Sequence, residues 1–155
     1  MKKRLPALSI SIVLVLVLAT FSSASAAPPQ SLHIVQNCNI NGSCESFEAS
    51  GAAVDSGLVC PVGTTVQLSF DSSGAAGGTL SILHVVKRFT CGDNSGTFDI
   101  ALTVRLDLVS HYTTASWRIV GGTDSYASLR GRGSLAGTPI DPGVSIHDVY
   151  DGTVH

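Results

Sequence analysis

The most regular pattern of apolar and polar positions lies between residues 96 and 109, where the two kinds of side chain alternate one by one. The apolar positions are Phe98, Ile100, Leu102, Val104, Leu106 and Leu108. Polar residues such as Asp99 and Thr103 fall between them. A period of two is typical of a β-strand with one buried and one solvated face, whereas a helix would scatter these residues around its circumference. We therefore predict a strand whose apolar row faces inward and whose Thr103 faces solvent.

Similar patterns predict strands along most of the remaining chain. The segments are 31–36, 45–49, 56–60, 64–73, 79–91, 115–120 and 144–152, together with a strand that carries Gly131 and Gly133. In 64–73 the residues Val66, Leu68 and Phe70 share one side. Turn-forming clusters rich in glycine separate the segments, and no amphipathic helix follows the N-terminal region. This arrangement is typical of an all-β domain, either a closed barrel or a sandwich.

The first 26 residues have the organisation of a secretory signal peptide. Lys2, Lys3 and Arg4 precede the apolar run "ISIVLVLVLA", and Ala24-Ser25-Ala26 suits a signal peptidase. The apolar run is shorter than the roughly 20 residues that span a bilayer, so we predict no stable membrane anchor. We expect a Sec-type signal peptide at 1–26, an N-terminal arm and loop at 27–43 and one β domain at 44–155. The predicted location is extracellular.

Four cysteines in an exported chain predict disulfides. Three pairings are possible, and we favour Cys38–Cys44, which closes a short polar loop, and Cys60–Cys91, which joins the ends of two predicted strands. Zinc ligands would be expected at closer paired spacing, so we predict no metal site.

The charge and the glycine pattern argue against nucleotides and nucleic acids. Nine basic residues become six once Lys2, Lys3 and Arg4 are removed, against eleven acidic ones, which gives a net charge of about −5. An acidic chain repels polyphosphates. Gly131, Gly133 and Gly137 do not have the G-x-G-x-x-G spacing of a dinucleotide loop, and two prolines follow where a helix would be required. We predict neither a nucleic-acid partner nor a cofactor.

Several glycine-rich motifs resemble the barrel superfamily of dirigent proteins and allene oxide cyclases. The segment "WRIVGGTDSYASLRGRGSL" is similar to a strand that ends in a G-G-T-G turn and is followed by an R/L-G-x-G strand, although Asp124 replaces the last glycine of that turn. "FEASGAAVDSG" resembles an early strand pair. "FTCGDNSGTFDIALTVRL" and "DVYDGTV" resemble the central hairpin and closing strand of small exported bacterial members.

This resemblance implies a single antiparallel eight-stranded β-barrel with a central cavity. Plant members of the superfamily steer phenoxy-radical coupling or cyclise a fatty-acid epoxide, and some bacterial members cyclise polyketides. No motif in this chain allows their catalytic residues to be matched position by position. Members often form trimers, so both a monomer and a trimer remain open for this protein.

Three residues are candidates for acid–base chemistry. Asp148 and Tyr150 share one face of their strand, so both would enter the lumen if that face points inward. A strand that frays at the rim, with Asp148 solvated, is the alternative. His84 lies in an apolar strand and could face the cavity or be a core histidine. The candidates for lining the lumen are Phe98, Ile100, Leu102, Val104 and Trp117.

Two functional classes follow. The first is a secreted module with an apolar lumen, which either binds a small apolar ligand or serves only as a stable extracellular structure. The second is a cofactor-free cyclase or isomerase that acts on a small apolar substrate inside the barrel. We favour the module over the enzyme, because no catalytic motif is present and the bulky row from Phe98 to Leu108 favours a filled interior.

Overall fold

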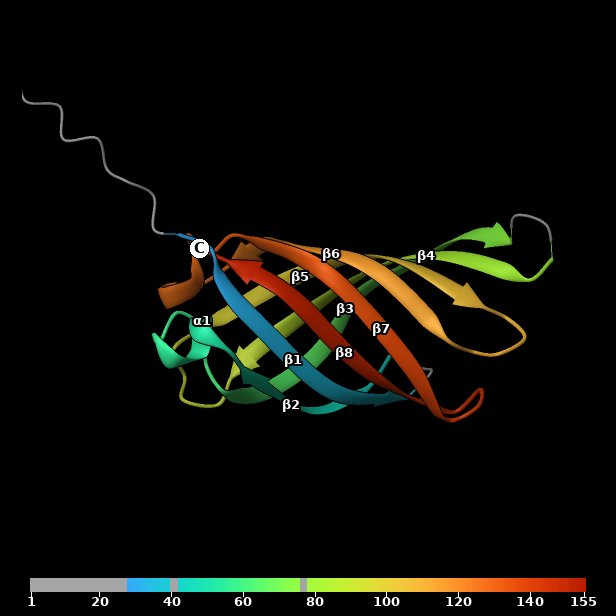
Figure 1. Ribbon diagram of the computed structural model, residues 1–155, viewed down its shortest axis with the longest axis horizontal. Helices are drawn as coiled ribbons and strands as arrows, with labels where there is room; N and C mark the ends of the chain where they lie inside the picture. Colours follow the sequence, from blue (N-terminus) through green and yellow to red (C-terminus); the bar gives the residue numbers. More distant parts are fainter. Residues whose placement is uncertain (1–27, 40–41, 76–77) are drawn as a thin grey trace, which may run out of the picture.

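The chain folds into a closed antiparallel barrel, as the computed structural model shows for residues 28–39, 42–75 and 78–155 (Figure 1). The predicted signal peptide at 1–26 lies outside the described residues. The eight strands are β1 (Gln30–Asn39), β2 (Cys44–Ser50), β3 (Val62–Ala75), β4 (Leu80–Cys91), β5 (Thr97–Asp107), β6 (Thr113–Gly122), β7 (Gly131–Asp141) and β8 (Ser145–Val154). Each strand pairs with the next, and β1 pairs with β8, which confirms the predicted fold class.

The two ends of the barrel differ. The last residues of β1, β3, β5 and β7 and the first residues of β2, β4, β6 and β8 lie together at one end of the barrel, on the right in Figure 1, and we call it the hairpin end. The other end carries the short helix α1 (Ala52–Asp55) and the 3-10 turn η1 (Asp124–Tyr126), together with the C-terminus. We call this the helix end.

The barrel begins earlier than the expected boundary at residue 44. Residues 30–39, which we assigned to an N-terminal arm, are strand β1. It pairs along its whole length with β8 and on its other side with β2, and Leu32 and Ile34 are buried in the core. Without β1, the edges of β2 and β8 would expose unpaired backbone groups, so closing the barrel requires this segment.

The predicted strand at 56–60 does not exist, and "FEASGAAVDSG" is the end of β2 followed by α1 rather than a strand pair. Gly51 and Gly57 have φ angles of 103° and 73°, a backbone region that glycine adopts readily, and they flank the single helical turn. The apolar residues that suggested a strand instead cover the helix end, where Val59 and Cys60 are buried.

A β-bulge in β3 changes which residues face inward. The pairing with β4 shifts between Gln67 and Ser69, so Leu68 has no partner residue on β4. Val66 pairs with the outward-facing Arg88, whereas Phe70 pairs with the buried Val85. The expectation that Val66, Leu68 and Phe70 share a face is therefore wrong, because one extra residue inverts the alternation.

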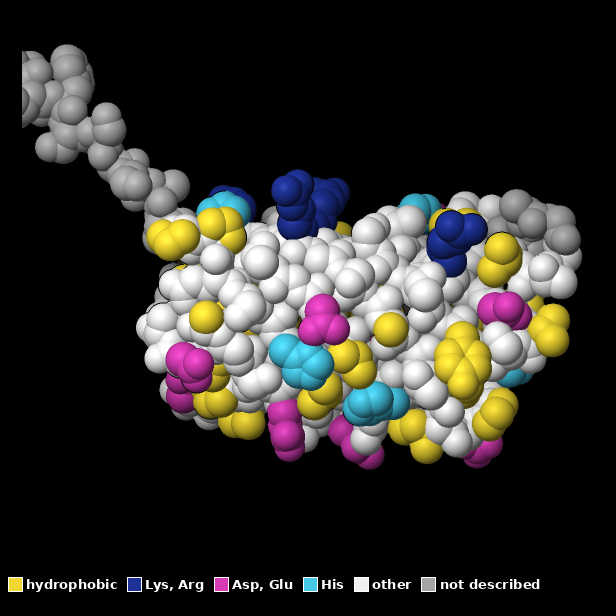
Figure 2. Space-filling model, viewed as in Figure 1, with side chains coloured by type: hydrophobic (Ala, Val, Ile, Leu, Met, Phe, Trp, Pro, Cys, Tyr) yellow, Lys and Arg dark blue, Asp and Glu magenta, His cyan; other side chains and the backbone are white. Residues whose placement is uncertain are grey.

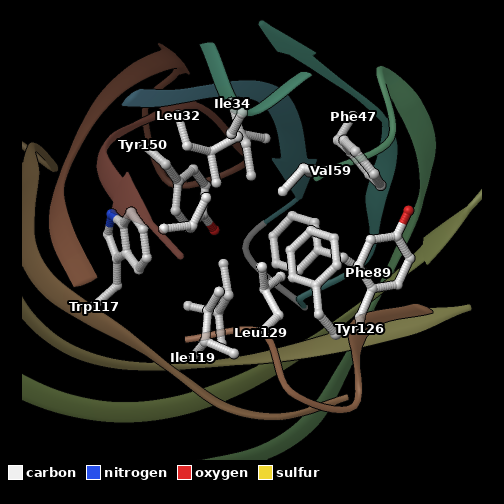
Figure 3. Packing of buried hydrophobic residues seen from close by; sticks show 14 of the residues in the cluster. Leu32, Ile34, Phe47, Val59, Phe89, Trp117, Ile119, Tyr126, Leu129 and Tyr150 are labelled. Atoms are coloured by element: carbon white, nitrogen blue, oxygen red, sulfur yellow. The ribbon is translucent and has the colours of Figure 1, made fainter. Parts of the chain in front are cut away.

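Aromatic side chains fill the helix end of the barrel (Figure 3). The rings of Phe89 and Phe98 stack with centroids 5.1 Å apart, and Phe47 and Tyr150 meet Phe89 edge-on at 5.2 and 5.8 Å. Tyr126 of η1 packs against Phe98 from the end of the barrel. These contacts leave the helix end solid, so any space for a ligand must lie nearer the hairpin end.

Glycines on β7 and β8 create the space for Trp117. A Cβ atom placed on Gly133 would lie 2.6 Å from Trp117 Cζ2, and Gly152 lies opposite Gly133 across the strand pair. The indole nitrogen donates a hydrogen bond to the Ser134 carbonyl oxygen at 2.9 Å. The glycine-rich strand that the sequence predicted is thus a packing surface for one large side chain.

Both predicted disulfides are confirmed. Cys60–Cys91 joins the segment after α1 to the end of β4 at the helix end. Cys38–Cys44 joins β1 to β2 next to their connection at the hairpin end.

Candidate functional site

The interior of the barrel near the hairpin end contains a cavity of about 150 Å³. Its walls are mainly aliphatic and come from β4, β5, β7 and β8: Leu83, Val85, Leu102, Val104, Leu135 and Ile146. Phe70 and Val144 also line it and lie at its mouth, where each residue is more than half exposed to solvent. The barrel is therefore solid at one end and hollow at the other.

A buried ion pair lies at the inner end of this cavity. Lys87 Nζ of β4 donates a hydrogen bond to Asp148 Oδ2 of β8 at 3.1 Å. The two side chains are only 9% and 8% exposed, and both line the cavity. The cavity thus combines apolar walls with one cationic and one anionic group, which is the usual composition of a small-molecule site.

The strand register explains why both charged groups point inward. Lys87 alternates with the buried Val85 and Phe89 along β4, and Asp148 alternates with the buried Tyr150 along β8. Turning Lys87 outward would require β4 to slip by one residue, which would expose both apolar neighbours. The packing of β4 therefore fixes the position of the ammonium group.

The Cys38–Cys44 disulfide forms part of the surroundings of the pair. Lys87 Nζ lies 3.4 Å from Cys38 Sγ and 3.5 Å from Cys44 Sγ. Sulfur is a weak hydrogen-bond acceptor, so Asp148 Oδ2 is the only strong acceptor that Lys87 has among the described residues. The other carboxylate oxygen, Asp148 Oδ1, has no hydrogen-bond partner within the part of the chain that the structure describes.

Tyr150 lies one step deeper in the barrel and closes the inner end. Its hydroxyl accepts a hydrogen bond from Gln36 Nε2 at 2.8 Å, and its ring contacts Phe89. Burial raises the pKa of Tyr150 well above its usual value, and the nearby Asp148 charge acts in the same direction, whereas the Gln36 hydrogen bond opposes both. Tyr150 is therefore a neutral phenol at ordinary pH.

The structure places the sequence-predicted acid–base residues differently. Asp148 and Tyr150 are both buried on the inward face of β8, so the alternative of a solvated Asp148 at a fraying rim is wrong. Only Asp148 lines the cavity. His84 is exposed on the outer face of β4, where it pairs across the sheet with Asp71 and Thr103, so it is neither in the cavity nor in the core.

The predicted lumen residues divide between the two halves of the barrel. Phe98, Ile100, Leu102, Val104 and Trp117 are all buried. Leu102 and Val104 line the cavity, whereas Phe98 and Ile100 lie deeper along β5 and Trp117 lies against the glycines of β7 and β8. Leu108, which we expected inside, follows the end of β5 and is 42% exposed.

Lys87 was not among the site residues predicted from the sequence, although its position on an apolar strand face could have identified it. Lys87 is the only lysine after Lys3, and it occupies the apolar face of a strand on which Val85 and Phe89 are its neighbours. A lysine is rarely buried without a partner, so a lysine on an apolar face predicts an acidic group opposite. Gln36, on the apolar face of β1, carried a similar signal.

Apolar side chains are also exposed around the mouth of the cavity. Figure 2 shows hydrophobic side chains over the hairpin end, where the β5–β6 connection carries Val109 and Tyr112 and the end of β7 carries Ile140. Each of these three residues is more than half exposed. These exposed apolar residues lie at the same end of the barrel as the mouth of the cavity.

In comparisons with known proteins, no family model, no curated protein and no solved structure matches this chain. Within residues 28–39, 42–75 and 78–155, no three His, Cys, Asp or Glu side chains converge as metal ligands would. None of the helices in these residues is long and apolar enough to cross a bilayer.

Proposed function

We propose that the protein is a binding module whose barrel cavity holds a small, largely apolar molecule with one neutral polar end. The observation that carries this proposal is the buried Lys87–Asp148 pair at the inner end of a mainly aliphatic cavity. Burying two charges costs several kcal/mol per ion, and well-packed apolar residues would often be as stable or more stable. A charge pair beside a cavity is therefore better explained by binding than by stability.

The cavity limits the body of the ligand. A cavity of about 150 Å³ lined by aliphatic side chains can hold a molecule the size of benzene. The open mouth beside Phe70 and Val144 would allow a longer apolar substituent to extend over the hairpin end. A single ring or a short branched chain is the body that fits.

The charge pair determines the polar end. Lys87 and Asp148 together carry no net charge, so an anionic end would be repelled by Asp148 and a cationic end by Lys87. A hydroxyl group avoids both penalties because it can donate a hydrogen bond to Asp148 Oδ1 and accept one from Lys87. The expected ligand is therefore an alcohol, a phenol or a similar neutral compound.

Two further properties belong to this proposal. The N-terminal pattern supports export by a Sec-type signal peptide, and two disulfides suit an oxidising compartment. The closed eight-stranded barrel and the glycine turn between β6 and β7 are consistent with a distant relation to the dirigent and allene oxide cyclase barrels. We propose this relation as an architectural one that transfers no activity.

Calorimetric titration with three matched compounds tests the proposal. Benzyl alcohol, benzoate and benzylamine share one ring and differ in the charge of the polar end. We expect benzyl alcohol to bind with a Kd of about 1 mM or below, corresponding to about −4 kcal/mol, and the two charged compounds to bind more weakly. Stronger binding of either charged compound would refute the neutral polar end. Absence of binding by all three would refute the binding cavity.

Catalysis is the second candidate function, because the buried carboxylate of Asp148 lines the cavity, where it would be placed to act as a general base. Such a protein would be a cofactor-free isomerase or cyclase acting on a small apolar substrate. Incorporation of solvent deuterium next to the carbonyl of cyclohexanone, absent in Asp148→Asn, would favour the enzyme. If the wild-type protein incorporated no deuterium, the result would favour the binding module over the enzyme.

A further inference from the structure

We propose that Lys87 captures small aldehydes covalently as an imine inside the barrel cavity. The proposal rests on the binding cavity described above and adds a chemical class of ligand and a bond to it. An aldehyde with an apolar body of about one ring would enter from the hairpin end, and its carbonyl carbon would meet Lys87 Nζ at the inner end.

The location of the amine is the first argument. Lys87 is the only lysine among the described residues, and its ammonium group lies at the inner end of the cavity rather than in bulk solvent. The other basic residues of the barrel with comparably long side chains are arginines. A guanidinium group does not serve as a nucleophile in proteins, whereas a lysine held in an apolar pocket is the usual source of a Schiff base.

The neighbouring carboxylate supplies the proton transfers. Asp148 Oδ2 lies 3.1 Å from Lys87 Nζ and can take one proton from the ammonium group. The freed lone pair attacks the carbonyl carbon, so that the C–N bond forms while the C=O π bond opens. The oxygen then takes one proton from the new ammonium nitrogen and becomes the hydroxyl of a carbinolamine. The protonated Asp148 then returns its proton to this hydroxyl, which leaves as water while the C=N bond forms. One aldehyde and one ammonium group thus yield one iminium group and one water molecule.

The charge balance of the site favours the product. The iminium nitrogen keeps the positive charge of Lys87, so Asp148 remains paired and no buried charge loses its partner. The aliphatic walls formed by Val85, Leu102 and Leu135 would bury the body of the aldehyde. They would also hinder the approach of the water that reverses the reaction.

Reductive trapping tests the inference. The mature protein is incubated with benzaldehyde and cyanoborohydride, which reduces an imine to a stable secondary amine, and the digested protein is analysed by mass spectrometry. We expect the benzyl adduct on the peptide that contains Lys87, formed faster than the adduct on the N-terminal α-amine of the same chain. We also expect benzyl alcohol to protect Lys87 by competing for the cavity.

Two variants serve as controls. Lys87→Arg keeps the cation beside Asp148 but cannot form an imine, so the adduct in the cavity should disappear while the N-terminal adduct remains. Asp148→Asn keeps the shape of the side chain but accepts no proton from Lys87, so capture should be slower. If wild-type Lys87 reacts no faster than the α-amine, the inference is overturned. The binding of benzyl alcohol, measured separately, then decides whether the cavity proposal also fails.

Discussion

The Lys87–Asp148 pair allows a quantitative test of the site by a double-mutant cycle. Lys87→Met removes the cation, and Asp148→Leu removes the anion with little change in side-chain shape. Shape matters at residue 148, because a Cβ atom placed on Gly137 would lie only 2.8 Å from Asp148 Oδ1, which shows how closely β7 approaches this side chain. The double variant replaces both charges with apolar groups.

The structure gives the expected magnitudes. Each single variant leaves one charge buried without a partner, since the two side chains are 9% and 8% exposed, and removing one member of such a pair costs about 3–5 kcal/mol. The double variant leaves no buried charge, and apolar replacement of both members is often neutral or stabilising. We therefore expect the free energy of unfolding of the double variant to lie within about 2 kcal/mol of the wild-type value and well above that of either single variant.

Urea denaturation under non-reducing conditions measures the four free energies of unfolding. The coupling energy is the difference between the loss in the double variant and the sum of the two single losses. A favourable coupling of several kcal/mol would support a desolvated pair at the inner end of the cavity. If each single variant lost less than about 1 kcal/mol of unfolding free energy and the two losses were additive in the double variant, the reasoning would be refuted, because solvent-exposed pairs behave in this way.

Three other predictions concern the barrel. Leu102→Ala should lower the free energy of unfolding by about 2–5 kcal/mol and Thr103→Ala by less than about 0.5 kcal/mol, as urea melts would show; equal losses would mean that both faces of β5 are covered. Gly133→Ala should cost about 1–3 kcal/mol and alter Trp117 fluorescence, because the new methyl group would clash with the backbone carbonyl oxygen of Asp151 and press on the indole; an unchanged melt would contradict this packing. The raised pKa of Tyr150 should make stability fall above about pH 10, where the unfolded state loses the phenolic proton and the folded state keeps it; Tyr150→Phe should show a shallower fall, and identical pH profiles would argue against it.

The alternation of apolar and polar residues predicted most strands of the barrel, because one face of each strand contacts the core and the other contacts solvent. It identified β5 and the inward positions of Phe98 and Leu102 without any tertiary information. It failed in β3, because a bulge is a local change in pairing that leaves the composition of the strand unchanged. It also failed at 56–60, where Val59 and Cys60 are buried by covering the end of the barrel rather than by forming a strand.

The candidate site was only half predictable. Asp148 and Tyr150 could be assigned to one face of a strand, but whether that face points inward depends on closure by β1, which lies far away in the chain. Lys87 was detectable as a charge on an apolar face, yet its partner is set by the barrel and not by any local spacing. The division into a solid and a hollow half depends on how Phe47, Phe89 and Tyr150 meet from three different strands.

The central claim is that a neutral, polar-ended molecule binds in the hairpin-end cavity beside the charge pair. Backbone-amide NMR spectra recorded during a titration with benzyl alcohol test the location directly. We predict that the largest shifts occur at Val104, Lys87 and Asp148, with little change around Phe47 in the solid half. A second, shallower hollow is lined by residues of β6, β7 and β8, among them Arg118, Arg132 and Thr153. If the largest shifts occurred there, or if no shifts occurred at all, the account would be contradicted.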